Sequence, residues 1–195
     1  MPGSGSRVKK SGAASNRGPA AAAENRAALL DAARRLFSEE GYRIPFSAIA
    51  RAAGVAQAVM YRHFPSKLDV ALAVFEENLT ELESISADPE PLAFWRVWDR
   101  LVVMTIESAS FVEIAIEARL QLPEYTGTAR LEALIDAPLA RARAAGLAPA
   151  DLTTERVLLT ERMVYGLVAT STAAADTRAA VDRGLALVPW TAARH

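Results

Sequence analysis

Residues 54–67 read GVAQAVMYRHFPSK, and this stretch decides the fold. The leading glycine allows a tight turn, because glycine accepts a positive φ at little cost. A short helix is predicted after the turn, ending at Pro65. Met60 and Phe64 lie four residues apart on one face of this helix, which leaves polar, aromatic and cationic side chains on another. Such a helix can enter a DNA groove and hold phosphates on both sides.

The residues before this turn complete a helix-turn-helix pattern. The spacing predicts a helix over 46–53 with Ile49 and Ala53 on one face. Ala50 is small, which lets the next helix cross closely, and Val55 is an apolar plug beside the turn. For the short helix taken alone, a solvated amphipathic helix is the alternative interpretation, because such motifs are short.

Together these residues resemble the DNA-binding half of the tetracycline-repressor (TetR) family. The similarity extends over about residues 24–80 and is carried by Ala50, Gly54, Val55, the run 61–67 and, upstream, residues 28–37 and 41–42. It implies an all-α protein with two parts. An N-terminal head of three helices would contain the helix-turn-helix, and a C-terminal helical body would bind a ligand and dimerise.

The resemblance also implies which side chains contact DNA. Gln57 and Ala58 would contact bases, since glutamine offers adenine a donor and an acceptor and the alanine methyl can meet a thymine methyl. Phosphates would be held by Tyr61, His63 and Lys67, and Arg62 could take either role. The predicted DNA-binding residues are Ser47, Gln57, Ala58, Val59, Tyr61, Arg62, His63 and Lys67.

This chain departs from the family pattern where small hydroxyl side chains are usual. Ala56 opens the third helix without a hydroxyl N-cap, a loss that costs a helix about 1 kcal/mol. Val59 replaces a second hydroxyl, and Ile44-Pro45 replaces a pair before the second helix, where Pro45 can still start a helix. The operator sequence and the DNA affinity are therefore not determined by the resemblance.

The charge is divided between the two parts of the chain. Residues 1–67 hold 11 Lys and Arg against 4 Asp and Glu, whereas residues 68–195 hold 11 against 19. A basic head on an acidic body suits a protein whose head meets a polyanion. The alternative is chance clustering, which is the weaker explanation for so large a difference in a short chain.

Composition excludes several classes of site. The chain has no cysteine and only two histidines, His63 and the terminal His195, so we expect no disulfide, no metal or cofactor site and no Ser-His-Asp triad in the body. No apolar run approaches a membrane span, and the N-terminus lacks the apolar core of a signal peptide. We therefore expect a cytoplasmic protein that does not contact a membrane and is not an enzyme.

Changes of composition and helix-breaking residues along the chain predict four segments. Residues 1–20 are rich in Gly, Ser, Ala and Pro with scattered cations, which indicates a disordered basic arm that lies along DNA or is a plain solvated tail. Residues 21–67 form the DNA-binding head. A capping box of Ser66 and Asp69 opens a connecting helix over 68–84. Residues 85–195 form the body, with helices predicted over 92–107, 111–120, 126–145, 152–174 and 176–187.

The body holds bulky apolar side chains with a few polar ends, which is the composition of a ligand pocket. Ordinary core is the alternative for each of them. The predicted ligand-binding residues are Trp95, Trp98, Met104, Glu107, Phe111, Tyr125 and Met163. Among these, Glu107 would either anchor a cationic ligand or face water at a helix end.

The last two helices resemble the dimerisation pair of the family. Residues 157–169 are apolar nearly all round, so either a partner copy covers them or the helix is buried within one chain. A two-fold interface there would place two recognition helices about one DNA turn apart. The predicted interface residues are Leu158, Leu159, Arg162, Tyr165, Gly166 and Ala169.

These observations favour one function over two others. The first is a homodimeric transcriptional repressor that a small-molecule ligand releases from a palindromic double-stranded operator. The second, suggested by Ala56 and Val59, is a small-molecule-binding protein or enzyme with a weakened DNA-binding head. The third is an architectural DNA binder whose body only dimerises.

Overall fold

The computed structural model describes residues 18–122, 124, 126–171 and 174–192 of the chain. No strand occurs in these ranges, so the all-α prediction is confirmed. The elements are α1 (Gly18–Glu40), α2 (Phe46–Ala52), α3 (Gln57–His63), α4 (Lys67–Ser86), α5 (Ala93–Glu107), α6 (Ser110–Gln121), α7 (Gly127–Ala144), α8 (Thr154–Thr170), α9 (Ala174–Ala186) and α10 (Pro189–Ala192). No helix of the described part of the chain has the length and apolarity needed to cross a membrane.

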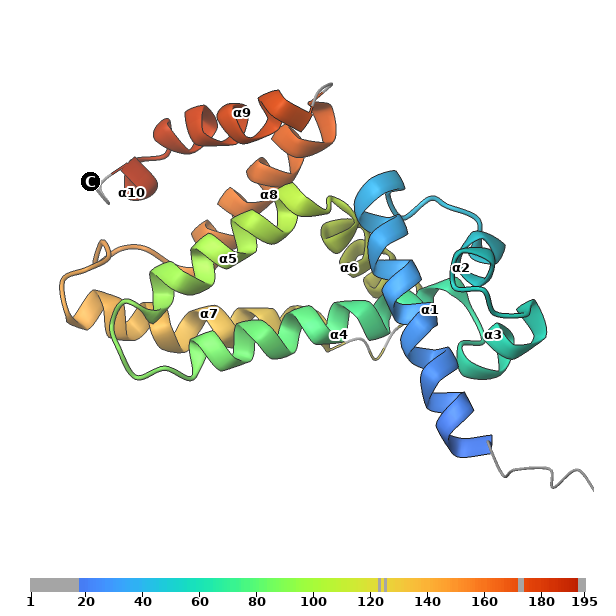
Figure 1. The fold of residues 1–195 in the computed structure, drawn as a ribbon. Helices are drawn as coiled ribbons and strands as arrows, with labels where there is room; N and C mark the ends of the chain where they lie inside the picture. The colour runs from blue at the N-terminus through green and yellow to red at the C-terminus, as the bar shows by residue number, and fades with distance from the viewer. Residues whose placement is uncertain (1–17, 123, 125, 172–173, 193–195) are drawn as a thin grey trace, which may run out of the picture.

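The head, α1 to α3, and the body, α5 to α10, are joined by the long helix α4 (Figure 1). Helices α2 and α3 lie on the outer side of α1, at the end of the molecule away from α9 and α10 (Figure 1). Inside the head, Leu29, Ile49 and Met60 have no exposed surface and bring the three helices together. This arrangement leaves the outer face of α3 open to solvent.

The turn between α2 and α3 closes α2 with a left-handed glycine. Gly54 has φ 66°. Its N–H donates to the carbonyl of Arg51 at 3.2 Å, and the N–H of Val55 donates to the carbonyl of Ala50 at 3.0 Å. This pair of bonds is the Schellman pattern that satisfies the last carbonyls of a helix. The predicted helix-turn-helix is thus confirmed, with Ala50 buried beneath the turn.

Helix α4 begins with the predicted capping box. The Ser66 hydroxyl accepts from the N–H of Asp69 at 3.2 Å, and the Asp69 carboxylate accepts from the N–H of Ser66 at 2.8 Å. The two residues satisfy each other's free N–H groups, which fixes where the head ends. The helix continues to Ser86, two residues beyond the predicted end.

Arg130 ties α7 to α4. Its guanidinium donates to the Glu76 carboxylate at 2.7 and 3.0 Å and to Glu83 at 2.6 Å. The hydrogen bonds from Arg130 hold the pKa of the Glu76 carboxyl below its ordinary value. Because the three side chains lie at the surface, these bonds fix the alignment of the helices more than they add to stability.

Two more helix boundaries and one helix also differ from the sequence-based expectations. Residues Gly18–Ala20, predicted as part of the basic arm, are the first turn of α1, and the rest of that arm lies outside the described residues. Helix α8 ends at Thr170 because Ser171 turns to an extended conformation. The short helix α10 was not predicted, although it carries the buried Trp190.

Candidate nucleic-acid interface and ligand cavity

The outer face of α3 presents most of the side chains predicted to contact DNA. Gln57, Ala58, Tyr61 and Arg62 are exposed, while Val59 and His63 are partly buried at its edges. The opposite face packs inward through Met60, followed by Phe64 just after the helix. Ser47 is exposed on the neighbouring helix α2. The exposed set has the mixture of amide, hydroxyl and guanidinium donors that contacts to bases and phosphates require.

Tyr61 is held in place by an aromatic contact that the sequence did not reveal. Its ring meets that of Phe46 edge to face, with the centroids 5.2 Å apart and the planes at 88°. The tyrosine nevertheless stays 54% exposed. A ring fixed in this way presents its hydroxyl in one direction, which lowers the entropy lost when it binds a phosphate.

Both short helices of the motif begin without a side-chain cap. Ala56 precedes α3 in the extended conformation of an N-cap, at φ −63° and ψ 141°, but offers no acceptor. Pro45 takes the same position before α2, which begins at Phe46 as predicted. Ile44 is buried, and this explains why an apolar residue stands there in place of a hydroxyl. One of the departures from the family pattern, Ile44, is therefore a residue of the core.

Lys67 has a role beyond the predicted phosphate contact. Its ammonium donates to the carbonyls of Tyr42 at 2.8 Å and Ile44 at 3.3 Å and lies 4.3 Å from the centre of the Tyr42 ring. An ammonium has three donors, so two are already engaged with the loop between α1 and α2. A phosphate contact by Lys67 stays a prediction, and it would have to use the third.

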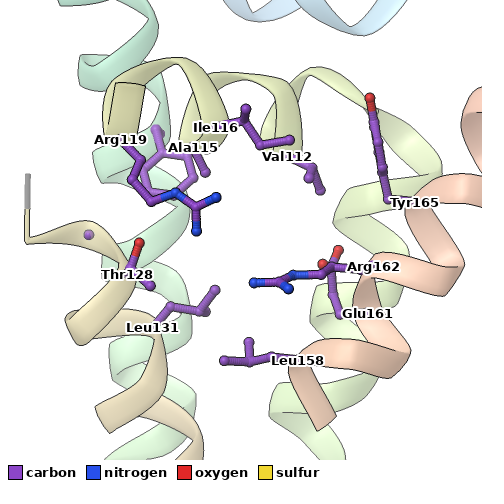
Figure 2. Close-up of a pocket in the computed structure, with 12 residues that line it drawn as sticks. Val112, Ala115, Ile116, Arg119, Thr128, Leu131, Leu158, Glu161, Arg162 and Tyr165 are labelled. Carbon is purple, nitrogen blue, oxygen red and sulfur yellow. The ribbon is translucent and has the colours of Figure 1, made fainter. Parts of the chain in front are cut away.

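A cavity of about 410 Å³ lies in the body between α4, α6, α7 and α8. We call it the α6–α8 cavity, and its lining residues are Phe75, Val112, Ala115, Ile116, Arg119, Gly127, Thr128, Leu131, Leu158, Glu161, Arg162 and Tyr165. The guanidinium groups of Arg119 and Arg162 point into it from opposite helices (Figure 2). Its size and its largely apolar walls are those of a small-molecule site, for which about 300–1,000 Å³ is usual.

Glu161 is the buried acid of this cavity. The Thr105 hydroxyl lies 2.8 Å from its Oε1 and 3.0 Å from the carbonyl oxygen of Leu101. A hydroxyl has one proton, so when Thr105 donates to the carbonyl, a protonated Glu161 can donate to Thr105. Burial raises the pKa of the Glu161 carboxyl, against smaller opposing effects of Thr105 and the Arg162 charge. The acid is therefore biased toward its neutral form.

The described residues predicted to bind the ligand do not line this cavity. Trp95 and Trp98 are buried in an aromatic cluster with Phe94, and Trp190 completes it at 5.9 and 4.8 Å from the two tryptophans. This cluster corresponds to the core alternative, and contacts between rings of different helices stabilise it. The same two tryptophans also line a different hollow, of about 820 Å³, between α5, α9 and α10, so their assignment to a ligand wall stays a prediction.

The other predicted ligand residues also lie elsewhere. Met104 and Glu107 line a separate hollow between α1, α4, α5 and α6, where Glu107 pairs with Arg100 at 3.2 Å and faces water. Met163 is 49% exposed on the outer face of α8. The side chains of Phe111 and Tyr125 lie outside the described residues.

The predicted dimer residues divide between two faces of α8. Leu158, Arg162 and Tyr165 line the α6–α8 cavity. Leu159, Gly166 and Ala169 are exposed on other sides of the helix. One side of the apolar helix α8 therefore lines a cavity. Its other side is exposed, and the assignment of that side to a dimer interface stays a prediction.

Sequence reasoning missed the cavity because its walls come from distant segments. A signal was present: Val112, Ala115, Ile116 and Arg119 follow the spacing i, i+3, i+4, i+7 on α6. The same spacing on α8 holds Leu158, Glu161, Arg162 and Tyr165. An apolar stripe that ends in or contains an arginine marks each wall, but neither stripe shows which helix faces the other.

Comparisons with known proteins agree with this architecture. A profile described as bacterial regulatory proteins, tetR family, matches residues 29–74, which run from α1 through the helix-turn-helix into α4. The HTH-type transcriptional activator FasR of Mycolicibacterium smegmatis is 42% identical over 62 residues, which are 31% of this chain and 28% of that protein. The chain thus matches less than a third of the length of that relative.

Two solved structures resemble the whole arrangement of head and body. A TetR transcriptional regulator from Streptomyces coelicolor is 26% identical, with a TM-score of 0.58 over 84% of this chain and 95% of that one. The TetR transcription regulatory protein of Mycobacterium vanbaalenii is 28% identical, with a TM-score of 0.55 over 76% of this chain and 95% of its own. Residues 29–74 of this chain match the TetR family, and both of these solved structures are TetR regulators. The matched residues include the whole of α3, whose outer face holds most of the predicted DNA-binding residues.

Proposed function

We propose that this TetR-family chain is a homodimeric repressor, released from a palindromic operator when a small molecule occupies the α6–α8 cavity. The exposed face of α3 would read the operator, with Gln57 and Ala58 toward bases and Tyr61 and His63 toward phosphates. The body would join the two copies and hold the ligand. The observation that carries the proposal is the position of α6, which borders both the cavity and the head.

Helix α6 touches the head at two points. The Ser110 hydroxyl donates to the carbonyl of Phe37 at 2.7 Å, and the Glu113 carboxylate accepts from the N–H of Tyr42 at 3.2 Å. Phe37 and Tyr42 bracket the end of α1, directly before the loop that leads to the helix-turn-helix. The next turns of the same helix supply Val112 and Arg119 to the cavity wall. A ligand that moves this wall would therefore move the head.

Release requires that the ligand bind one arrangement of the two heads more tightly than the other. A coupling of about 1–3 kcal/mol is typical and changes affinity by roughly 5–150-fold. Two heads fit successive major grooves only near a separation of ~34 Å. A small displacement of α6 in each copy would suffice, because both heads must fit at once.

The dimer part of the proposal rests on the outer face of α8. Leu159 is 56% exposed and Met163 lies one turn further along, so an apolar strip faces solvent. Gly166 continues this strip and leaves room for close approach of another helix. Exposed apolar patches of this kind mark association surfaces in soluble proteins. A two-fold pairing would cover the strip with its own copy.

Binding to DNA from upstream of the coding sequence tests the proposal directly. The full chain is titrated onto that fragment and onto an unrelated fragment of equal length across a series of salt concentrations. We expect tighter binding to the upstream fragment and a linear fall of log K with log salt, since each neutralised phosphate releases counterions. Absent or salt-insensitive binding to every fragment would contradict a DNA-binding function.

A single substitution tests the assignment of the recognition face. Tyr61→Phe keeps the ring against Phe46 but removes the hydroxyl, so we expect about tenfold weaker operator binding, as for the loss of a hydrogen bond to a charged group. The thermal unfolding midpoint should stay the same because the packing is unchanged. Equal operator affinity in the two proteins would remove Tyr61 from the interface.

The direction of regulation has its own test. The relative from M. smegmatis is described as an activator, whereas the proposal here is repression. A reporter gene behind the upstream fragment should rise when the chain is deleted and fall again when it is supplied. A fall on deletion would replace repression with activation and leave the DNA-binding proposal intact.

A further inference from the structure

The two arginines of the α6–α8 cavity lack the partners that other body arginines have. Arg100 and Arg130 lie between helices and are paired with glutamates at 2.6–3.2 Å. In the described part of the chain, neither Arg119 nor Arg162 forms an ion pair or a hydrogen bond. Two unpaired guanidinium groups that face the same cavity create a positive field at one place.

Burial runs from one side of this cavity to the other. Phe75 is 3% exposed and Glu161 is 6% exposed, so they form the deep end. Leu131 and Leu158 are partly buried between them and solvent. Arg119 and Arg162 are exposed, so they stand at the mouth. A molecule that fits this gradient is apolar at one end and charged at the other.

The walls decide the shape of the apolar end. Apart from Phe75 and Tyr165, the apolar side chains of the walls are aliphatic, among them Val112, Ile116, Leu131 and Leu158 (Figure 2). The first turn of α7, at Gly127 and Thr128, reaches the same space and has no side-chain cap on its free N–H groups. The positive end of the helix dipole adds to the field of the two arginines.

We propose that the α6–α8 cavity takes an amphipathic organic anion, with a carboxylate between Arg119 and Arg162 and an aliphatic chain directed toward Phe75. A guanidinium holds a carboxylate with two parallel hydrogen bonds, which fixes orientation as well as charge. The inference rests on the proposed function in one respect, that the anion acts as the effector. The aliphatic walls would bind the chain by removing its methylene groups from water.

A cationic or neutral ligand fits the same walls less well. The one buried carboxyl group of the lining, Glu161, is engaged with Thr105 and is biased toward its neutral form by burial. A cation would also have to pass between two guanidinium groups of like charge. Glu132 and Asp136 lie with Arg162 around an adjoining hollow. Their carboxylates are the groups that would compete with an anionic ligand for the Arg162 guanidinium.

Three probes with one chain length separate these alternatives. Decanoate, decanol and decylamine carry the same aliphatic tail with a negative, neutral and positive head, and each is titrated calorimetrically into the full chain without DNA. We expect decanoate to bind at least about tenfold more tightly than decanol, and decylamine to bind least. No binding of decanoate, or equal affinity for decanoate and decanol, overturns the proposal.

Substitutions locate the site. Arg119→Gln and Arg162→Gln should each weaken decanoate binding by about tenfold and leave decanol binding unchanged, because only the head loses a partner. Arg119→Lys should retain part of the affinity, since it keeps the charge but not the fork of donors. The matched control Arg35→Gln removes the same charge from an exposed position on α1. Unfolding curves confirm that each variant is folded.

Two further readouts separate this inference from the proposed function. If decanoate binds through the arginines but does not release operator DNA, the anion site stands and the effector role fails. If decanol or decylamine releases DNA as well as decanoate does, the regulator stands and the anion site fails. If the two glutamine variants change the dimer mass in sedimentation but not decanoate affinity, the arginines pair with a second copy and the proposal is overturned.

Discussion

The turn that defines the head is closed by contacts between near neighbours along the chain, whereas an aromatic cluster of the body joins its two ends. Gly54 and Val55 close α2 by bonds to residues within the same turn. In the body, Trp190 from α10 packs on Phe94 and Trp98 from α5, at 6.2 and 4.8 Å. The head therefore depends on the conformation of single residues, and the body on the fit of large side chains.

The difference extends to the functional surfaces. The predicted DNA-binding face lies mostly on one side of α3, so most of its members follow each other in sequence from Gln57 to His63. The α6–α8 cavity takes residues from four helices, and Phe75 is separated from Arg162 by most of the body. A surface of the first kind changes with each substitution along α3, while the second changes with any shift of one helix against another.

The largest effect is expected where the body joins its ends. Trp190→Ala should lower the free energy of unfolding by about 3–5 kcal/mol, because it opens a cavity among the rings and removes the bond from the indole N–H to the Thr160 hydroxyl at 3.2 Å. Denaturant unfolding monitored by circular dichroism measures this loss. It should exceed the loss from any single change in the turn of the head.

A matched variant separates the packing from the hydrogen bond. Trp190→Phe keeps a ring in the cluster but has no N–H, so it should recover more than half of the loss. If Trp190→Ala costs less than the head substitution described below, α10 contributes little, and the contrast between the two regions is wrong.

What could be predicted from the sequence follows the same division. The helix-turn-helix and the capping box of Ser66 depend on a few consecutive residues, and both were predicted, the capping box with its partner Asp69. The helices of the body were predicted within a few residues, because each has its own apolar period. Period alone does not show which helices face each other, and so the residues that line the α6–α8 cavity were not predicted to bind a ligand.

Two individual residues show the same limit inside the head. Phe46 is adjacent to Tyr61 in space, but nothing in their spacing indicated that their rings meet. Lys67 was assigned a phosphate from the family pattern, yet its ammonium bonds to the carbonyls of Tyr42 and Ile44. A charged residue has several possible partners, and the choice depends on how the loop folds back.

The next effect tests the claim that the head depends on backbone conformation. Gly54→Ala should lower stability by about 1–2 kcal/mol, because an L-residue is strained at φ 66°. A Cβ at this position would meet no atom within 4 Å, so the loss is conformational and not steric. Gly54→Asn should lose less, since asparagine tolerates the left-handed region. Equal losses for both variants in thermal unfolding would point to a cause other than φ.

A smaller effect is expected where the head lacks a cap. Ala56→Ser should raise the free energy of unfolding by about 1 kcal/mol, because Ala56 already has the extended N-cap conformation and a serine oxygen can accept a free N–H of the first turn of α3. Ala58→Ser, two residues later and exposed, is the control and should give no gain. If both variants leave the unfolding midpoint unchanged, α3 is stabilised by its packing alone, as a body helix is.

The smallest effect concerns the buried acid of the body and depends on pH. Burial raises the pKa of the Glu161 carboxyl above its ordinary value of 4.5, so the folded protein holds this proton more tightly than the unfolded chain does. As pH rises from that value through the raised pKa, the unfolded chain loses its proton first, and the free energy of unfolding falls.

Glu161→Gln keeps the shape and the bond to Thr105 but does not titrate. The stability of this variant relative to the native protein should therefore increase with pH across that window, as measured by thermal unfolding at a series of pH values. Glu155→Gln, an exposed change on the same helix, controls for the change in net charge. A difference that stays constant with pH would mean that Glu161 is as well solvated as a surface residue, and that the deep end of the cavity is open to water.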